Sequence, residues 1–285
     1  MAKHKTALVL EGGGMRGAYT AGALSYLIDN DIRFDNAYGI STGAVYLLNY
    51  LIKSKKNLYD FSIKGIADKR VIGIRSLLSC GRIVNYDVLF DQILPNEYNF
   101  NLEDLKNTDI DAYIGLYDLK IGKTEYYSVK NITMDVLKAS TSLPILGKIV
   151  KYKDKELLDG GITDMIPIQK ALDDGCDRSL IITTKPASYI RKPAKKVIVN
   201  LMKAVYPQCE NISKDYSIRH INYNNQISLI KQLNDDKKAV YMYPSKDSNV
   251  SRLKGSKQEL IDLYNLGYSD MEKRKEDIKS LLKDD

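Results

Sequence analysis

The sequence predicts an α/β fold built around a mainly parallel β-sheet, and three observations carry this prediction. The first fifty residues alternate in the order strand, turn, helix, strand, turn, helix, which is how a parallel sheet with covering helices begins. Short apolar runs of strand length recur later, separated by segments with helical spacing. The chain has 285 residues, 44% hydrophobic and 28% charged, which suits an ordinary globular protein with a sizeable core.

The opening elements follow from short patterns. Thr6–Leu10 (TALVL) is a buried-strand pattern that runs into glycines, and Ala18–Ile28 has apolar residues at helical spacing. Asp35–Ile40 is a second short strand candidate, followed by the turn Ser41–Gly43. Ala44–Ile52 (AVYLLNYLI) is a strongly apolar helix. These elements make the start of a βαβα arrangement.

The later elements are expected from the same patterns. Strands are expected at Asp111–Leu119, Glu125–Val129, Ser179–Thr184 and Ala239–Tyr243, with a hairpin over Ile149–Leu158. Helices are expected at Met134–Ser142, over most of Pro193–Leu233, and on the surface within Ser256–Leu282. No repeat or linker divides the chain, so we expect a single domain over residues 1–285, with 190–285 as a possible helical C-terminal appendage.

Composition limits the possible partners and the location. The net charge is 43 − 36 = +7, which is typical of an ordinary lysine-rich solvated surface, with an anionic partner such as an acidic membrane surface as the alternative. The sequence contains no recognisable motif of a nucleic-acid-binding module, so no nucleic acid partner is expected. The three cysteines are scattered without CxxC spacing, which suggests neither a disulfide framework nor a zinc site. No run of about 18 apolar residues and no signal-peptide core is present, so we expect a cytoplasmic protein, with peripheral membrane contact as an option.

The sharpest chemical signal is a G-x-S-x-G sequence at Gly39–Gly43 (GISTG). In such a motif Ser41 sits on a tight strand-to-helix turn, and Gly39 and Gly43 are needed because the strand and helix leave no room for a Cβ. The turn exposes the hydroxyl above a helix N-terminus, where the helix dipole favours a developing anion. The alternative is that Ser41 is only a helix N-cap.

The second signal is the glycine loop Gly12–Gly17 (GGGMRG), which lies between a strand and a helix. It fits the dinucleotide-binding pattern G-x-G-x-x-G, but that use requires an acidic residue at the end of the second strand, and Asp35 precedes its strand. Backbone N–H groups of a glycine loop can instead stabilise an oxyanion, and an arginine adds positive charge beside them. The candidate oxyanion-loop residues are Gly12, Gly13, Gly14, Arg16 and Gly17.

A serine nucleophile needs a base, and the sequence offers two histidines, His4 and His220. His4 lies in an N-terminal tail that we expect to be mobile, and His220 lies in a polar stretch without a catalytic signature. A carboxylate is then the better candidate. Asp159, followed by Gly160 and Gly161, ends a strand-like segment and could contact the serine in a water-poor cleft that raises its pKa. The alternative is an Asp-Gly turn without chemistry.

These motifs in this order resemble the patatin-like phospholipase family, in particular its bacterial members. The resemblance rests on five segments: Glu11–Gly17 (EGGGMRG), Gly39–Gly43 (GISTG), Ala139–Pro144 (ASTSLP), Asp159–Gly161 (DGG) and the stretch Val250–Tyr268. It implies a three-layer α/β/α sandwich and a Ser–Asp dyad without histidine, metal or cofactor. By this resemblance Ser41 is the nucleophile, Asp159 the base, and the loop around Gly13 and Gly14 the oxyanion hole, with Arg16 in the family's usual basic position.

The sequence therefore predicts a serine acyl hydrolase that cleaves fatty-acyl esters of lipids or phospholipids through an acyl-enzyme. A short-chain carboxylesterase or lysophospholipase is the alternative within enzymes. The non-enzymatic alternatives are a lipid-binding protein without turnover and a nucleotide-binding protein that uses the Gly12–Gly17 loop.

Overall fold

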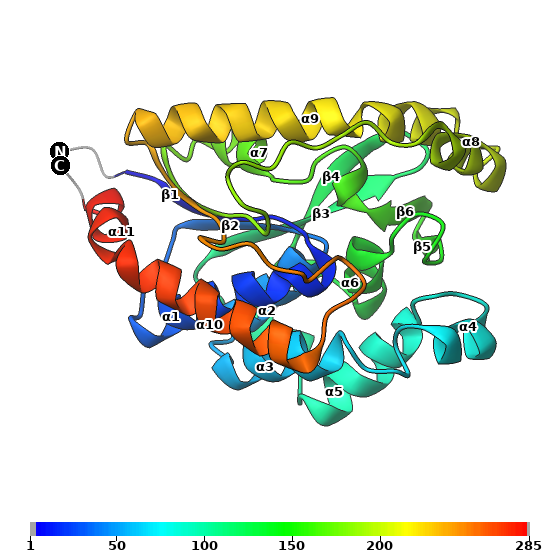
Figure 1. Ribbon diagram of the computed structural model, residues 1–285, viewed down its shortest axis with the longest axis horizontal. Coiled ribbons are helices and arrows are strands. Elements are labelled where there is room, and N and C mark those ends of the chain that lie inside the picture. The colour runs from blue at the N-terminus through cyan, green and yellow to red at the C-terminus, as the bar shows by residue number, and fades with distance from the viewer. Residues whose placement is uncertain (1–3, 284–285) are drawn as a thin grey trace.

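The fold is a three-layer α/β/α sandwich around one eight-stranded sheet (Figure 1). A computed structural model describes residues 4–283. The strand order is β5-β6-β3-β2-β1-β7-β8, and β4 pairs with β3 outside this path. Neighbours from β3 through β2, β1 and β7 to β8 are parallel, whereas β4, β5 and β6 run antiparallel to their partners. The strands are β1 (Thr6–Leu10), β2 (Asn36–Ile40), β3 (Asp111–Asp118), β4 (Lys123–Ser128), β5 (Val150–Tyr152), β6 (Lys155–Asp159), β7 (Arg178–Ile182) and β8 (Ala239–Met242).

The central strands are buried on both faces, which explains why they read as continuous apolar runs. In β1, Leu8 and Leu10 point into one core cluster and Ala7 and Val9 into another. Each of these two clusters is closed by its own helices, and a third, smaller cluster contains Tyr117, Leu158 and Ile212.

One face of the sheet is covered by helices from both ends of the chain (Figure 1). They are α1 (Ala18–Asp29), α2 (Thr42–Leu51), α3 (Lys55–Asp60), α6 (Met134–Thr141) and α10 (Lys257–Lys273). The backbones of α1 and α10 touch where two glycines meet: a Cβ at Gly22 would lie 1.8 Å from Tyr264 O, and one at Gly267 would lie 2.0 Å from Tyr19 O. Hydrogen bonds from Tyr264 to Ser25 (2.6 Å) and from Tyr19 to Asp270 (3.4 Å) join the two helices at this crossing.

The other face is covered mainly by α7 (Ile168–Asp173) and the long α9 (Glu210–Asp235) (Figure 1). The preceding helix α8 (Lys196–Val205) packs beside α9 at one end of the molecule, and α11 (Lys275–Leu281) contacts the β7–β8 edge. Thus β8 and α10, which follow residue 190, are built into the sheet and its covering layer.

Residues 53–110 form a set of short helical turns that the sequence patterns do not announce. They are α3, η2 (Phe61–Gly65), α4 (Ile74–Cys80), η3 (Val88–Ile93), α5 (Leu94–Glu97) and η4 (Leu102–Leu105). Their apolar side chains, among them Leu58, Phe61, Phe90 and Ile93, join the core cluster that contains α1 and α2. Tertiary packing rather than local periodicity holds these turns.

The predicted α/β class and mainly parallel sheet are confirmed, and each predicted strand and helix is present within a few residues of its expected bounds. One expectation is wrong. His4 is not in a mobile tail, because its ring nitrogens lie 2.6 Å from Asp177 and 2.6 Å from Arg178, which fixes it beside β7. The expected surface helices within 256–282 are present, and their apolar face, with Leu260, Leu263 and Met271, is buried against the core. Residues 1–3, at the basic N-terminus, lie outside the described residues.

Within residues 4–283, no helix combines the length and apolar character needed to cross a lipid bilayer.

The close approach of α1 and α10 at these glycines predicts that a larger side chain there lowers the stability of the fold. Gly267→Val should lower the free energy of unfolding by about 3 kcal/mol, because the new Cβ would meet the Tyr19 carbonyl and force α1 and α10 apart. Denaturant titration followed by circular dichroism measures this. Asn265→Val is the matched control, since residue 265 is exposed on the same helix and should change stability by less than about 0.5 kcal/mol. Equal losses in the two variants would contradict a close helix crossing.

Candidate active site

Ser41 lies on a strained turn between the end of β2 and the start of α2. Its backbone has φ 56° and ψ −131°, a conformation that a residue with a Cβ rarely adopts. The crowding expected around the motif is present, because a Cβ at Gly39 would lie 2.8 Å from the Gly43 carbonyl oxygen and one at Gly43 would lie 2.7 Å from the Glu11 carbonyl oxygen. Ser41 occupies the N-cap position of α2, but its side chain makes no capping hydrogen bond, so the hydroxyl is not used in the way that the alternative interpretation requires.

The glycine loop packs directly onto this turn. A Cβ at Gly12 would lie 2.6 Å from the Ser41 Cβ, so a larger residue could not stand there without moving the serine. The backbone N–H groups of Gly13 and Gly14 both donate to Thr42 Oγ1, at 3.1 and 3.0 Å. Two amide donors of the loop therefore converge on one oxygen beside Ser41, which is the type of arrangement that stabilises an oxyanion.

The remaining loop residues lie farther from the serine. Gly17 packs against the ring of Tyr46, where a Cβ would meet Cε2 at 2.4 Å. Arg16 lines a neighbouring cavity with Tyr189 and Arg191 and is absent from the lining of the cavity that holds Ser41 and Asp159. The structure thus brings Gly12, Gly13 and Gly14 to the serine and places Gly17 and Arg16 behind them.

A buried ion pair anchors the loop, and sequence reasoning did not identify it. Glu11, at the carboxyl end of β1, accepts hydrogen bonds from the Thr184 N–H (2.6 Å), the Thr184 hydroxyl (2.9 Å) and the Lys185 ammonium. Both charged side chains are at least nine-tenths buried. Burial lowers the pKa of Lys185 to about 8, and the Glu11 carboxylate partly opposes this. A glutamate directly after a buried strand was the available signal, because such a charge needs a buried partner.

Asp159 ends β6 and shares a cavity with Ser41. Its side chain is 3% exposed, accepts a hydrogen bond from the Gly161 N–H at 2.8 Å, and interacts with the Ser41 hydroxyl. Gly160 allows β6 to approach β3, since a Cβ there would lie 2.5 Å from the Gly115 carbonyl oxygen. The Asp-Gly-Gly sequence therefore places a carboxylate beside the serine.

The environment of Asp159 favours a base of moderate strength. Burial raises the pKa of this carboxyl above its ordinary value of 3.8, and hydrogen bonds from Ser41 and Gly161 and the nearby Arg219 and Arg252 guanidiniums partly oppose the increase. An aspartate with a raised pKa that remains ionised near neutral pH can accept a proton from a serine hydroxyl.

Neither histidine lies in this cavity. His220 is on α9, where its Nδ1 contacts the Ser217 carbonyl oxygen at 3.0 Å, and His4 is held beside β7. Asp35 accepts hydrogen bonds from Thr6 at the amino edge of the sheet, opposite the glycine loop, where it could not reach a nucleotide ribose. In the part of the chain that the structure describes, no group of three or more His, Cys, Asp or Glu could hold a metal ion.

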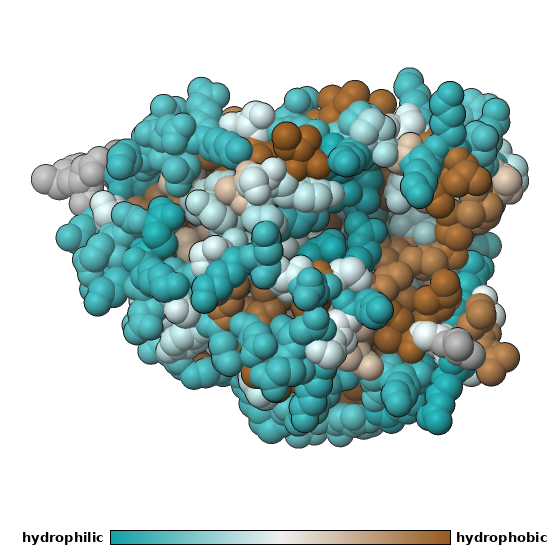
Figure 2. All heavy atoms as spheres, viewed as in Figure 1, coloured by the Kyte–Doolittle hydropathy of each residue, from teal (hydrophilic) through white to brown (hydrophobic). Residues whose placement is uncertain are grey.

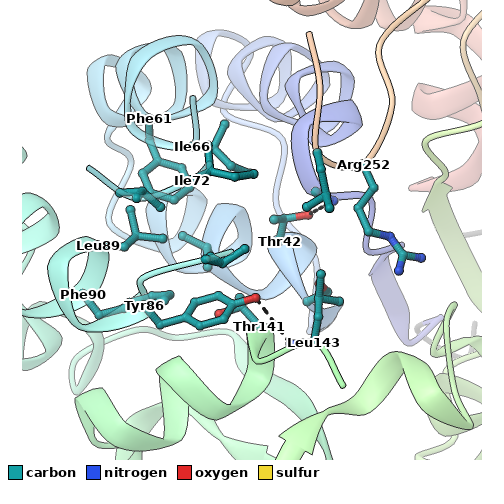
Figure 3. Close-up of a pocket in the computed structure, with 16 residues that line it drawn as sticks. Thr42, Phe61, Ile66, Ile72, Tyr86, Leu89, Phe90, Thr141, Leu143 and Arg252 are labelled. Atoms are coloured by element: carbon teal, nitrogen blue, oxygen red, sulfur yellow. Dashed lines mark hydrogen bonds between the residues drawn. The ribbon is translucent and has the colours of Figure 1, made fainter. Parts of the chain in front are cut away.

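An apolar pocket extends from Ser41 into the helical segment 61–90 (Figure 3). Its cavity volume is about 50 Å³, and nearly all of its surface is carbon. Figure 3 shows Phe61, Ile66 and Ile72 gathered on one side of the pocket, whereas the Arg252 guanidinium points away from them on the other side. Further lining residues are Val45, Val71, Val84, Tyr86, Leu89, Phe90, Thr141, Leu143 and Leu253. The segment 53–110, whose helical turns the sequence patterns did not predict, thus supplies most of the apolar wall of this pocket.

Comparisons with known proteins agree with this fold and motif order. Residues 8–109 match the patatin-like phospholipase family, and residues 209–283 match a domain of unknown function (DUF6363). The uncharacterized protein YjjU of Escherichia coli strain K12 is 24% identical over 196 residues, which cover 66% of this chain and 54% of that protein. This chain therefore spans about half the length of that curated relative.

A solved structure, VipD from Legionella pneumophila, has a similar fold. Its TM-score to this chain is 0.53 at 13% sequence identity, and the match covers 98% of this chain and 67% of VipD. The family match contains the glycine loop and the Ser41 turn, and the structural match extends over nearly the whole sandwich. The match over residues 8–109 and the similar fold of VipD support a patatin-like family for this chain.

Proposed function

We propose that the chain is a serine acyl hydrolase that cleaves fatty-acyl ester bonds of lipids through a Ser41–Asp159 dyad. One observation carries the proposal: a serine on a strained turn shares a cavity with a buried carboxylate, at the mouth of an apolar pocket. The strained turn presents a nucleophile, the carboxylate supplies a base, and the pocket suits an acyl chain. The family match supports lipid ester substrates.

The proposed reaction has two halves. Asp159 accepts the Ser41 proton while Ser41 Oγ bonds to the ester carbonyl carbon, and the oxyanion is held by glycine-loop amides. A charged oxyanion is a stronger acceptor than the Thr42 hydroxyl, so the Gly13 and Gly14 N–H groups can turn to it. The bond to the leaving alkoxide then breaks, and Asp159 returns the proton to give an alcohol and an acyl-enzyme. Water, deprotonated by Asp159, attacks the acyl-enzyme, and Ser41 departs with the proton as the fatty acid is released.

The dyad makes a direct mutational prediction. Ser41→Ala and Asp159→Asn should each abolish hydrolysis of nitrophenyl esters, with a loss of roughly 10⁶-fold for the nucleophile, because each removes a group that forms or breaks a bond. His220→Ala is the control and should retain activity, since the His220 ring contacts the Ser217 carbonyl oxygen of its own helix. Mass spectrometry after fluorophosphonate treatment should find the adduct on Ser41. If His220→Ala is as inactive as Ser41→Ala, the dyad is wrong.

The raised pKa of Asp159 predicts the acid limb of the pH profile. The ionised carboxylate is the active form, so kcat/KM for a neutral ester should fall as pH drops through a midpoint above the ordinary aspartate value. Arg252→Gln removes a cation that lowers this pKa, so the midpoint should move to higher pH. Lys254→Gln, an exposed neighbouring charge, should leave the midpoint in place. If the midpoint does not move when Arg252 is replaced, Asp159 is not the titrating base.

The alternatives differ in measurable ways. A carboxylesterase or lysophospholipase would hydrolyse short-chain or single-chain esters but not intact phospholipid vesicles. A lipid-binding protein would retain fatty acid without turnover. A nucleotide-binding protein would be stabilised thermally by NAD or ATP and would not be labelled at Ser41, an outcome that the position of Asp35 disfavours.

We further propose that one end of the molecule contacts an anionic membrane. Figure 2 shows hydrophobic side chains gathered at the end of the molecule where α4 and α8 lie in Figure 1. Leu78 on α4 is 82% exposed and Val197 on α8 is 69% exposed. Lysines 192, 195, 196 and 203 are exposed on or next to α8. Exposed apolar side chains beside lysines suit the boundary between lipid headgroups and acyl chains.

The membrane surface can be tested with vesicles. Leu77→Asp/Leu78→Asp should weaken binding to phosphatidylglycerol vesicles at least tenfold, because two anions replace apolar groups that would enter the bilayer. Ile221→Asp, at an equally exposed isoleucine on α9, is the matched control and should bind normally. Added salt should weaken the binding. Equal binding to neutral phosphatidylcholine vesicles at all salt concentrations would contradict an anionic membrane partner.

A further inference from the structure

Asp159 begins a glycine-rich loop, residues 159–166, which we call the aspartate loop. Strand β6 ends at Asp159, η6 (Gly160–Ile162) makes a single turn, and α7 does not begin until Ile168. The two glycines of this loop have no side chains with which to hold their own backbone, and glycine can adopt many conformations. The position of the Asp159 carboxylate therefore depends on what holds the aspartate loop from outside.

Helix α9 holds the far end of the aspartate loop with two amide side chains. Asn222 and Gln226 lie four residues apart, which places them on the same face of the helix. Asn222 Nδ2 donates to the Thr163 carbonyl oxygen at 3.3 Å. Gln226 bonds to the loop twice, since its Nε2 donates to Asp164 Oδ1 at 2.5 Å and its Oε1 accepts from the Ile166 N–H at 3.2 Å. The loop is thus tied to one face of α9.

Arg219, one turn earlier on the same face, holds the end of the loop that lies next to Asp159. Its Nε donates to the Gly161 carbonyl oxygen, and the Gly161 N–H donates to Asp159 Oδ1 at 2.8 Å. Gly161 is enclosed between the two side chains, since a Cβ there would lie 3.1 Å from Asp159 Oδ1 and 3.4 Å from Arg219 Nη2. Arg219 and Ser41 line the same cavity. Contacts therefore run from α9 through Gly161 to the carboxylate.

The Arg219 guanidinium is well placed to hold this carbonyl. Its Cζ lies 5.6 Å from the ring centre of Tyr216, three residues earlier on α9, so the aromatic face limits where the guanidinium can move. Hydrogen bonds from a charged donor are roughly twice as strong as neutral ones. This strength matters because a misplacement of about 1 Å at a reacting group can lower a rate by about 100-fold. A loosened aspartate loop would separate Asp159 from the Ser41 hydroxyl, with which it interacts here.

We propose that Arg219 is a positioning residue for Asp159: by holding the Gly161 carbonyl, it keeps the carboxylate within reach of the Ser41 hydroxyl. This inference rests on the proposed function, because it takes Asp159 as the base. It also assigns a role to residues 209–283, which match a domain of unknown function and contain α9. Those residues complete a site whose nucleophile lies within residues 8–109.

Turnover measurements on three variants test this role. Arg219→Met removes the donor and the charge but keeps a long, unbranched side chain. It should lower kcat for a nitrophenyl ester roughly 30-fold or more and change KM by less than about threefold, because the base is displaced while the apolar pocket is intact. Arg219→Lys keeps a charged donor, so its kcat should exceed that of Arg219→Met at least about tenfold. Lys231→Met, at an exposed lysine on the same helix, is the matched control and should keep its kcat.

Hydrogen exchange followed by mass spectrometry tests the same contacts without turnover. In Arg219→Met, the peptide that covers residues 159–166 should exchange at least about tenfold faster, whereas peptides from β1 and α2 should exchange as before. Lys231→Met should leave all of these peptides unchanged. Gln226→Met is the second variant, in case Arg219→Met does not fold, because it removes two hydrogen bonds to the same loop. It should also speed exchange there and lower kcat. Circular dichroism melting shows whether each variant folds.

Each outcome bears on one proposal. If Arg219→Met keeps its kcat, if Arg219→Lys restores none of the loss, or if Lys231→Met loses as much, the positioning role is overturned. A fall in kcat with faster exchange throughout the sheet, or with no faster exchange in the aspartate loop, also overturns it. If the unsubstituted chain cleaves no ester but Arg219→Met loosens only the aspartate loop, α9 does hold that loop and the proposed hydrolase function fails instead.

Discussion

The ion pair between Glu11 and Lys185 holds the site in place. Glu11 follows the last residue of β1, and Lys185 and Thr184 follow the end of β7, so their contacts join the carboxyl ends of two neighbouring strands. The glycine loop begins at the next residue, and its position against Ser41 follows from where Glu11 is fixed. Removing one partner of such a pair leaves an uncompensated buried charge, which costs about 3–5 kcal/mol. The pair also sets the Lys185 ammonium against the rings of Tyr189 and Tyr223.

From this anchor the site divides into two halves of opposite character. On one side, helical turns from the segment 61–90 line an apolar pocket whose surface is almost entirely carbon. On the other, the loop after β7, helix α9 and the loop before α10 bring arginines together. Ser41 and Asp159 lie at the boundary, where burial raises the pKa of the Asp159 carboxyl and the nearby arginines partly oppose the increase.

The sequence predicts much of the sheet but less of the site. Strands such as Thr6–Leu10 and Arg178–Ile182 are legible because both faces are buried and the apolar runs are uninterrupted. The glycine and serine motifs can be predicted because crowding at residues 12, 39 and 43 excludes a Cβ, so that glycine is required at these positions of the sequence. Residues 53–110 contain no such required residues and no regular apolar spacing, because the short helical turns there depend on contacts with distant parts of the chain. The arginines around the cavity could not be predicted for a related reason. Arg191, Arg219 and Arg252 are far apart in the sequence, and only tertiary packing brings them to one cavity.

The crossing of α1 and α10 affects how the molecule folds. Helix α1 follows the glycine loop directly, yet the helix that packs on its Gly22 is synthesised more than two hundred residues later. Contacts with such large sequence separation form slowly, because a long loop must close before they can contribute. During synthesis the N-terminal motifs therefore emerge without one of their covering helices, and the apolar face of α1 stays open until α10 has been made. A protein built this way would complete the helical layer behind its glycine loop late, once α10 is available to pack on α1.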